Sequence, residues 1–376
     1  MEKKATAKKK SVLKRLLYIV YLLVAVFILL ELVLRIFDPF HLRLKGDKIV
    51  LPVNQQLQID NSINPRLEPH ITNTRNSMGF RGPEWPSSPD STLTMITVGG
   101  STTACHFLND TKTWPWLLGK KLEDSFNHVW MNNAGLDGHS TFGHEILLND
   151  YLVKLHPKVI LFLTGINEIE NDEPSFHDKM NTRGAYTDFR HYIFENSEVL
   201  NLFLNLSRGW KAQRMNNTTN ALMPFNDLPT LRLSDSVINE TLLLQDPFLE
   251  AYSKRLSGII DTCNSHGILP VMLTQPFLFG KGVDPSTGIN LEERELHGHR
   301  NGKLEWMVLE KYNDVMRNLC KEKDVPCIDL AALMPKNSKY YYDKAHFSNE
   351  GADYLSSLLS EQLQPILQSH FPSYKK

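Results

Sequence analysis

The sequence predicts an α/β protein that has a parallel sheet of about five strands, helices on both faces of that sheet, and one transmembrane helix before it. Two observations support this fold class. An apolar run of membrane-spanning length lies near the N-terminus, and from residue 93 onward short apolar runs alternate with longer amphipathic segments. Repeated strand–helix–strand units produce parallel sheets that are covered by helices on both sides.

The charge of the 376-residue chain is unevenly distributed. Residues 1–15 form a basic tail with seven Lys and Arg residues and one Glu, so the rest of the chain has 34 basic and 41 acidic residues, a net charge of about −7. Binding to nucleic acid requires clustered cations that neutralise phosphates. The main part of the chain is therefore not expected to bind nucleic acid.

The basic tail precedes an apolar segment, residues 16–37, which we expect to be a transmembrane anchor. At about 1.5 Å per residue, a helix from Leu16 to Leu34 spans roughly 28 Å, close to the thickness of the hydrocarbon core of a bilayer. Glu31 precedes Arg35 by four residues, so the two can pair on one helix face. The length of the run and the absence of a small-residue cleavage site favour an anchor over a cleaved secretory signal.

The lysines before the apolar segment favour a cytoplasmic N-terminus. Everything after residue 37 would then lie outside the cytoplasm, in a periplasm, at a cell surface or in a lumen. In such a compartment Cys320 and Cys327 could form a disulfide, with two free buried thiols as the alternative. Cys105 and Cys263 are expected to be buried and unpaired.

Residues 38–90 lack a clear periodicity and carry scattered Pro and Asn residues. We expect them to form a connector packed on the main domain, which would span residues 91–370. Within that domain, residues 170–246 are far longer than a usual loop. They are expected to form an insertion, a partly helical cap over the strand ends.

Five apolar runs in the main domain have the length of buried strands. They cover residues 93–98, 129–134, 158–164, 268–275 and 325–330. The amphipathic segments between and after them predict helices at about 113–126, 140–155, 247–266 and 304–324, with a last one after 348. Asp246-Pro247 is a plausible helix start, because proline is favoured at the first helical position.

Polar, glycine-containing segments follow four of these strands. They are GGSTT with Ser101, NAGLDGHST with Gly138, GINE with Asn167, and YYYDKAHFSNEG with Asp343 and His346. Loops at the carboxyl ends of parallel strands meet at one edge of the sheet. We therefore expect these segments to converge, although they span about 245 residues of sequence.

The residue types in these segments suit acyl transfer. A serine hydroxyl such as that of Ser101 is a weak nucleophile that needs an adjacent base, and His346 can be that base. Asp343 can hold the imidazole in the required tautomer. The backbone N–H groups of Ser101 and Gly138, together with the side-chain amide of Asn167, can donate hydrogen bonds to a developing oxyanion.

The segments GGST, NAGLDG, GINE and DKAH resemble the four blocks of the SGNH (GDSL-like) hydrolase family, and they occur in the family's order across residues 93–360. The resemblance implies a flavodoxin-like three-layer α/β/α domain and serine-dependent hydrolysis or transfer of O-acyl groups, without a metal or another cofactor. It implies that Ser101 is the nucleophile, His346 the base and Asp343 its partner. Ser101, Gly138 and Asn167 would form the oxyanion hole.

Two positions depart from the family's pattern. Gly100 stands where the name-giving motif has Asp, and Glu168 stands where Asp is common. Neither replaces an implied catalytic group, so these departures concern the positioning of groups rather than the chemistry.

Other interpretations of these residues are less favoured. Ser101 could simply cap a helix after a strand, but GGSTTAC has neither the Gly-Lys-Ser/Thr of a P-loop nor the Gly-x-Ser-x-Gly of an α/β-hydrolase elbow. The pairs His139/His144 and His297/His299 have no known metal-binding spacing, so no metal is expected. The run Tyr340–Tyr342 fits packing, with a stacking wall for a sugar as the alternative.

The sequence therefore predicts a membrane-anchored serine esterase whose catalytic domain lies outside the cytoplasm. Its substrate would carry O-acyl groups, O-acetyl groups included, on a glycan or a lipid. Two alternatives remain open. An O-acyltransferase that modifies an exported polysaccharide would use the same residues, and a non-catalytic glycan-binding protein would keep the same fold.

Overall fold

The computed structural model describes residues 2–37, 44–45, 50–51, 53–175, 178, 197–200, 223–296 and 298–376. The chain forms two compact units. One unit combines Met1–Leu42 with Gly184–Thr219, and the other combines Arg43–Arg183 with Asn220–Lys376.

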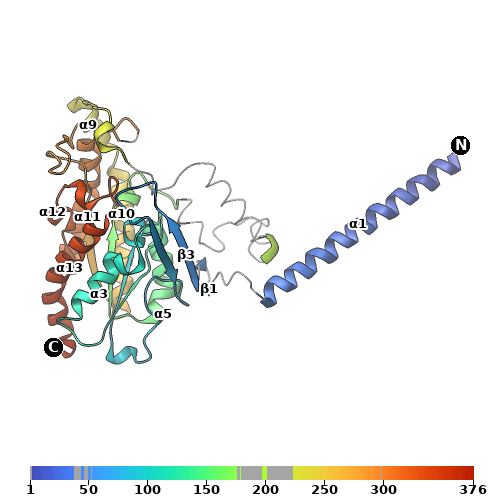
Figure 1. The fold of residues 1–376 in the computed structure, drawn as a ribbon, viewed down its shortest axis with the longest axis horizontal. Coiled ribbons are helices and arrows are strands. Elements are labelled where there is room, and N and C mark those ends of the chain that lie inside the picture. Colours follow the sequence, from blue (N-terminus) through green and yellow to red (C-terminus); the bar gives the residue numbers. More distant parts are fainter. Residues whose placement is uncertain are drawn as a thin grey trace. The chain divides into compact units, whose positions relative to one another are not determined.

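The first unit contains the long helix α1, Glu2–Phe37 (Figure 1). Its segment Lys14–Ile36 has a mean hydropathy of 2.8 and is long and apolar enough to cross a membrane. A secretory signal sequence near the N-terminus can meet the same criteria of length and composition. The predicted pair within this helix is present, because Arg35 Nε lies 2.8 Å from Glu31 Oε1.

The carboxylate of Glu31 also binds a short helical segment of the insertion within the same unit. It accepts hydrogen bonds from Ser197 Oγ at 2.8 Å and from the backbone N–H groups of residues 198 and 199 at 3.0 and 3.2 Å. A negative charge at the first N–H groups of a helix is stabilising. This contact gives Glu31, the one acidic residue in the apolar part of the helix, three partners besides Arg35.

The second unit is built on a parallel sheet with the strand order β6-β5-β7-β8-β9. Each of the five predicted apolar runs coincides with one of its strands. They are β5 Leu93–Gly99, β6 Val129–Asn133, β7 Val159–Thr164, β8 Leu269–Thr274 and β9 Cys327–Ile328. Every adjacent pair is parallel. This is the strand order 2-1-3-4-5 of flavodoxin-like folds, in which the ligand site lies where the order reverses, beside the first and third strands.

Helices cover both faces of the sheet (Figure 1). The main ones are α3 Trp114–Leu122, α4 Thr141–Leu147, α10 Asp246–Ser265, α11 Gly302–Lys323 and α13 Asn349–His370. The start of α10 at Asp246 confirms the predicted Asp-Pro helix start. The single helix expected at 140–155 is instead divided into α4, a π-helical turn at Leu148–Leu152 and α5 Val153–Leu155.

The strands are apolar on both faces because each face packs against a helix layer. In β7, Leu161 and Leu163 belong to the core cluster shared with α3 and α13, whereas Ile160 and Phe162 belong to the cluster shared with α10 and α11. All six residues of β7 are buried. This double burial explains why the sequence shows continuous apolar runs rather than strict alternation.

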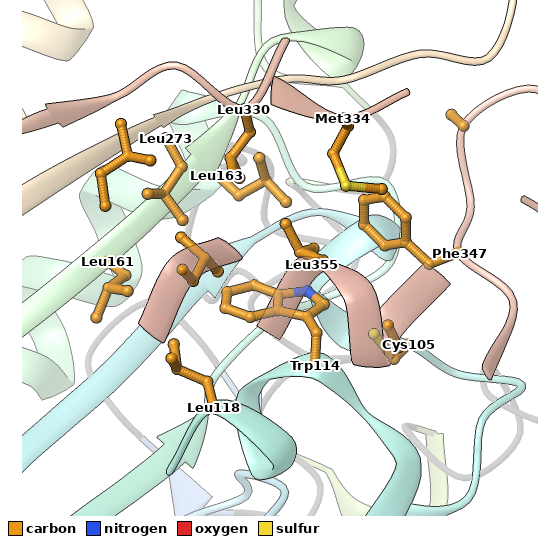
Figure 2. Close-up of a cluster of buried hydrophobic side chains, with 14 of the residues drawn as sticks. Cys105, Trp114, Leu118, Leu161, Leu163, Leu273, Leu330, Met334, Phe347 and Leu355 are labelled. Atoms are coloured by element: carbon orange, nitrogen blue, oxygen red, sulfur yellow. The ribbon is translucent and has the colours of Figure 1, made fainter. Parts of the chain in front are cut away.

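The core on the α3 and α13 side reaches the segment that follows β5. Figure 2 shows the Trp114 indole surrounded by aliphatic side chains, with Phe347 and Cys105 nearby. Trp114 is fully buried, and its Nε1 donates a hydrogen bond to the carbonyl of Thr102 at 3.0 Å. The packing of this core therefore fixes the backbone one residue after Ser101.

The region expected to be an irregular connector contains a hairpin that the sequence did not predict. Strands β3 Gln55–Asp60 and β4 His70–Arg75 pair in antiparallel register, after a small ladder of β1 Leu44–Lys45 and β2 Val50–Leu51. β3 is exposed along most of its length, so it carries no hydrophobic alternation to detect.

Shorter helices complete the described fold, namely α2 Ser101–Ala104, α9 Asp235–Leu243 and α12 Leu330–Leu333.

The insertion at 170–246 is described only in part. Helix α9 lies near its C-terminal end, and much of the expected cap falls outside the described residues.

The four cysteines are free thiols. Of the two alternatives for Cys320 and Cys327, the structure therefore has the free thiols.

Candidate active site

Ser101 lies directly after the central strand β5, at the start of helix α2. Gly100 is the N-terminal cap of this helix and adopts an extended backbone conformation. The first N–H groups of a helix have no partner within it, so the backbone N–H of Ser101 is available to an incoming oxygen. Because β5 lies between β6 and β7, the serine occupies the place where the strand order reverses.

The structure brings Ser101, His346 and Asp343 into one hydrogen-bonded line. His346 Nε2 lies 2.7 Å from Ser101 Oγ, and its Nδ1 lies 2.6 Å from Asp343 Oδ2. Asp343 Oδ1 accepts hydrogen bonds from the backbone N–H groups of Ala345 at 2.9 Å and His346 at 2.8 Å. These contacts close a tight turn just before α13, so the carboxylate and the imidazole are held on the same side of it.

The two titratable groups stabilise each other's charged forms. Burial lowers the pKa of His346, but the Asp343 carboxylate and, to a smaller extent, Asp137 raise it, so the net shift is upward from the ordinary value. Burial raises the pKa of Asp343, but the imidazole charge and the hydrogen bonds to this carboxylate shift it below its usual range. Asp343 is therefore ionised at neutral pH and stabilises a protonated His346.

An aromatic ring fixes the orientation of the imidazole. The ring of Tyr342 stacks on His346 with ring centres 5.4 Å apart and an interplanar angle of 11°. Tyr341 and Tyr342 are buried, and Tyr340 stacks on Tyr354 with ring centres 4.7 Å apart. The tyrosine run is therefore used for packing, not as an open stacking wall.

The two predicted oxyanion donors outside the serine segment are linked to each other. Gly138, in the loop after β6, has a φ of +71°, a left-handed conformation that favours glycine. Asn167, in the 3₁₀ turn after β7, donates from Nδ2 to the carbonyl of His139 at 2.9 Å. An amide nitrogen carries two hydrogens, so one remains for a further acceptor.

Gly100, the first departure from the family's pattern, lies against this amide. A Cβ at position 100 would lie 2.3 Å from Asn167 Nδ2 and 3.2 Å from the His139 carbonyl oxygen. Any side chain at this position, including an Asp, would displace the Asn167 amide from its place beside the serine turn. Gly100 therefore leaves the space that Asn167 occupies.

Glu168, the second departure, fixes the same turn from its other side. Its buried carboxylate accepts from the backbone N–H of Thr141 at 2.6 Å and from Thr141 Oγ1 at 2.7 Å, and it lies 3.2 Å from Arg255 Nη2. Burial raises the pKa of Glu168 to about 6, against the opposing effects of Thr141 and Arg255. The loop after β7 is thereby tied to the start of α4, three residues after Gly138.

Asp178, a residue of the insertion, is a contributor that sequence reasoning missed. Its carboxylate accepts hydrogen bonds from Ser140 N at 2.8 Å, Ser140 Oγ at 2.8 Å and Gly143 N at 3.2 Å, and so caps the start of α4. It lies in a segment without periodicity, so no sequence signal marked it. Arg255 left a weak signal, a cation on the apolar face of a predicted helix.

The histidines considered for metal binding are placed differently. His139 and His144 are buried with ring centres 6.3 Å apart, and burial lowers the pKa of His144 to about 3. His299 is exposed, and His297 lies outside the described residues. Among the described residues, no three His, Cys, Asp or Glu side chains form a group that could hold a metal ion.

Residues 96–354 match the model of the GDSL-like lipase/acylhydrolase family, and the chain belongs to this family. The match includes all five predicted site residues and runs from inside β5 to the second turn of α13. The protein is accordingly an ester-cleaving hydrolase. No curated protein matches the sequence.

Several solved structures are similar to this chain at low sequence identity. A putative lipolytic protein of the G-D-S-L family from Desulfitobacterium hafniense is 12% identical, with a TM-score of 0.39, over 72% of this chain and 99% of its own. The acetyl xylan esterase AlAXEase is 12% identical, with a TM-score of 0.39, over 71% and 98%. Axe2, an acetylxylan esterase from Geobacillus stearothermophilus, is 10% identical, with a TM-score of 0.41, over 72% and 93%.

The contact between Gly100 and Asn167 generates a kinetic prediction. In Gly100→Ala the new methyl group must displace the Asn167 amide, so we expect kcat for a short ester to fall about 10²–10³-fold, the usual effect of losing one oxyanion donor. Steady-state kinetics with p-nitrophenyl acetate measures this. Gly258→Ala is the matched control, because its Cβ would meet only Glu145 Oε1 at 3.2 Å. Wild-type kcat in Gly100→Ala would show that the position of this amide does not limit catalysis.

Proposed function

We propose that this protein is a membrane-anchored serine esterase that removes O-acyl groups through an acyl-enzyme on Ser101. The observation that carries the proposal is the line from Ser101 Oγ to His346 Nε2, at 2.7 Å, and from His346 Nδ1 to Asp343, at 2.6 Å. This order of hydroxyl, imidazole and carboxylate is the arrangement that activates a serine nucleophile.

The reaction has two balanced halves. Ser101 Oγ attacks the ester carbonyl while its proton passes to His346 Nε2, and collapse of the tetrahedral intermediate breaks the C–O bond to the alcohol, which leaves with that proton. Water then attacks the acyl-enzyme and gives its proton to His346. The acid is released, and the proton returns to Ser101 Oγ.

The oxyanion that forms in each half needs hydrogen-bond donors. We assign this role to the backbone N–H groups of Ser101 and Gly138 and to the free N–H of the Asn167 amide. The hydrogen bond from Asn167 to the His139 carbonyl fixes the amide before the substrate arrives. Fixed donors stabilise the transition state without reorganising during the reaction.

The proposed location and substrate follow from the rest of the chain. The apolar segment Lys14–Ile36 would hold the protein in the membrane, with the basic tail in the cytoplasm and the hydrolase unit outside it. Two similar structures belong to acetyl xylan esterases, which supports an O-acetyl glycan as one substrate class beside acylated lipids.

Removal of the serine hydroxyl tests the nucleophile. We expect Ser101→Ala to lower kcat for p-nitrophenyl acetate by roughly 10⁴–10⁶-fold, because no acyl-enzyme can form. The wild-type protein should carry a fluorophosphonate adduct on Ser101, detected by peptide mass spectrometry. Ser265→Ala, an exposed serine on α10, should behave as wild type. An adduct at another residue, or full activity in Ser101→Ala, would contradict the assignment.

The charge on Asp343 predicts a pH dependence. His346 accepts a proton only when it is neutral, and Asp343 raises its pKa, so kcat/KM should fall on acidification with an apparent pKa above the ordinary value of about 6.5. In Asp343→Asn the lowering effect of burial on the His346 pKa remains, while the larger of the two opposing charges is lost and only that of Asp137 is left. The acid limb should then move to lower pH, and kcat should fall about 10⁴-fold. An unmoved acid limb in Asp343→Asn, with Asp353→Asn as the surface control, would argue against His346 as the base.

The anchor is tested separately from catalysis. We expect the full chain to stay in the membrane fraction after alkaline carbonate washing and to retain residues 1–37 by intact mass, because a helix of this length is held by its apolar surface. Intact mass distinguishes the two interpretations of α1. A mature protein that begins after residue 37 would identify the segment as a cleaved signal.

A further inference from the structure

A cluster of polar side chains lies near the loop that carries Gly138 and has no role in the chemistry described above. It consists of Arg75 from the hairpin strand β4, His106 from the segment after α2, and Asp137 from the loop after β6. Three separate parts of the chain thus contribute one charged or titratable group each. We refer to these three residues as the polar rim.

The polar rim is held together and remains partly open to solvent. Asp137 Oδ2 lies 3.6 Å from His106 Nδ1, and the two side chains are 49% and 32% exposed. Asn73 Nδ2 donates to the backbone carbonyl of His106 at 3.0 Å, so β4 fixes the segment that carries this histidine. A half-exposed acid and a partly buried imidazole on a fixed backbone can bind a ligand with little ordering cost.

Its position in the chain and electrostatics place Asp137 near the reacting groups, and ring contacts link His106 to them indirectly. Asp137 directly precedes Gly138, and after Asp343 it is the next charge that raises the pKa of His346. A chain of ring contacts also connects them. His106 packs on Phe107 with ring centres 4.8 Å apart, Phe107 on Tyr342 at 6.5 Å, and Tyr342 on His346 at 5.4 Å.

Arg75 adds an unused donor to the polar rim. Its Nη1 is buried and has no hydrogen-bond partner among the residues that the structure describes, and Asp137 is the first of the charges that oppose the effect of burial on its pKa. A buried guanidinium N–H without a partner carries a desolvation cost that a ligand oxygen could offset. Burial lowers the pKa of His106, so at neutral pH its imidazole is neutral, with one donor and one acceptor.

The composition of the polar rim selects among possible ligands. The charges of Arg75 and Asp137 balance, and His106 is neutral, so the rim offers no net positive charge for a phosphate headgroup. Its mixed donors and acceptors suit hydroxyl groups, each of which donates and accepts. A long apolar chain would bury these polar groups without partners, which is costly.

We propose that Arg75, His106 and Asp137 bind the hydroxyl groups of a neutral sugar that carries the scissile ester. The substrate class is therefore an O-acylated glycan, not an acylated lipid. This inference rests on the proposed function of Ser101. It also makes the hairpin before the hydrolase core a part of the substrate site.

The test compares two substrates in full-length protein in detergent. One is a mono-O-acetylated neutral sugar, taken from a panel of glucose, xylose, galactose and N-acetylglucosamine esters, and the other is p-nitrophenyl acetate, which has no sugar hydroxyls. We expect Asp137→Asn and Arg75→Gln to lower the ratio of kcat/KM for the sugar ester to that for p-nitrophenyl acetate by about ten- to a hundredfold. Asp137→Asn also removes a charge that raises the pKa of His346, so it shifts the acid limb of the pH profile. This shift is the same for both substrates and therefore cancels in the ratio.

Matched surface variants control for nonspecific effects of charge. Asp353→Asn and Arg232→Gln remove exposed members of surface ion pairs and should leave the ratio at its wild-type value. Asp137 is half exposed, so its Asn variant is expected to fold even if Arg75→Gln does not. An unchanged ratio in Asp137→Asn would overturn the proposal.

The acyl-chain preference of the wild-type protein provides a second readout. We expect acetate release from at least one of the sugars, and weaker hydrolysis of p-nitrophenyl palmitate in micelles than of p-nitrophenyl acetate. Release from none of the sugars, or a preference for palmitate, would overturn the sugar assignment. Neither result would affect the role of Ser101, whose failure would instead appear as activity retained in Ser101→Ala.

Discussion

The hydrogen bond between Ser101 Oγ and His346 Nε2 joins two residues that are 245 positions apart, and the rest of the hydrolase unit determines whether it can form. One end is fixed by β5, which is buried along its whole length, and by Trp114, whose indole binds the carbonyl next to the serine. The other end is fixed by the Asp343 turn and by Phe347, which is buried in the same core cluster as Trp114. A single hydrophobic core thus holds both partners of the hydrogen bond.

The two departures from the family's serine and asparagine segments act on the same side chain. Gly100 leaves room for the Asn167 amide, and Glu168 ties the turn that carries it to Thr141 at the start of α4. The longer Glu side chain is compatible with burial because Thr141 and Arg255 satisfy its oxygens. Position 100 and position 168 are therefore best understood as one local arrangement around Asn167, not as two independent losses of Asp.

The sheet and the convergence of the site segments could be predicted because they depend on local signals. Buried strands leave continuous apolar runs, and a parallel sheet brings their carboxyl ends together regardless of distance in sequence. The hairpin carrying Arg75 could not be predicted in this way, since β3 is largely exposed and shows no alternation. The role of Asp178 left no sequence signal and that of Arg255 only a weak one, because each depends on tertiary contacts with α4 or the loop before it, and no short motif encodes such contacts.

The hairpin changes how the site is divided between scaffold and substrate recognition. Arg81, just after it, donates hydrogen bonds to the carbonyls of Ala104 at 2.9 Å and Cys105 at 2.7 Å, at the end of the helix that Ser101 begins. The same segment supplies Arg75 to the polar rim. This segment therefore contacts helix α2, which begins at Ser101, and also contributes to the polar rim. A change in the segment can alter substrate preference while Ser101, His346 and Asp343 stay the same. Diversification of substrate in such a hydrolase would then occur in the segment before β5, while the sheet and its strand-end turns stay constant.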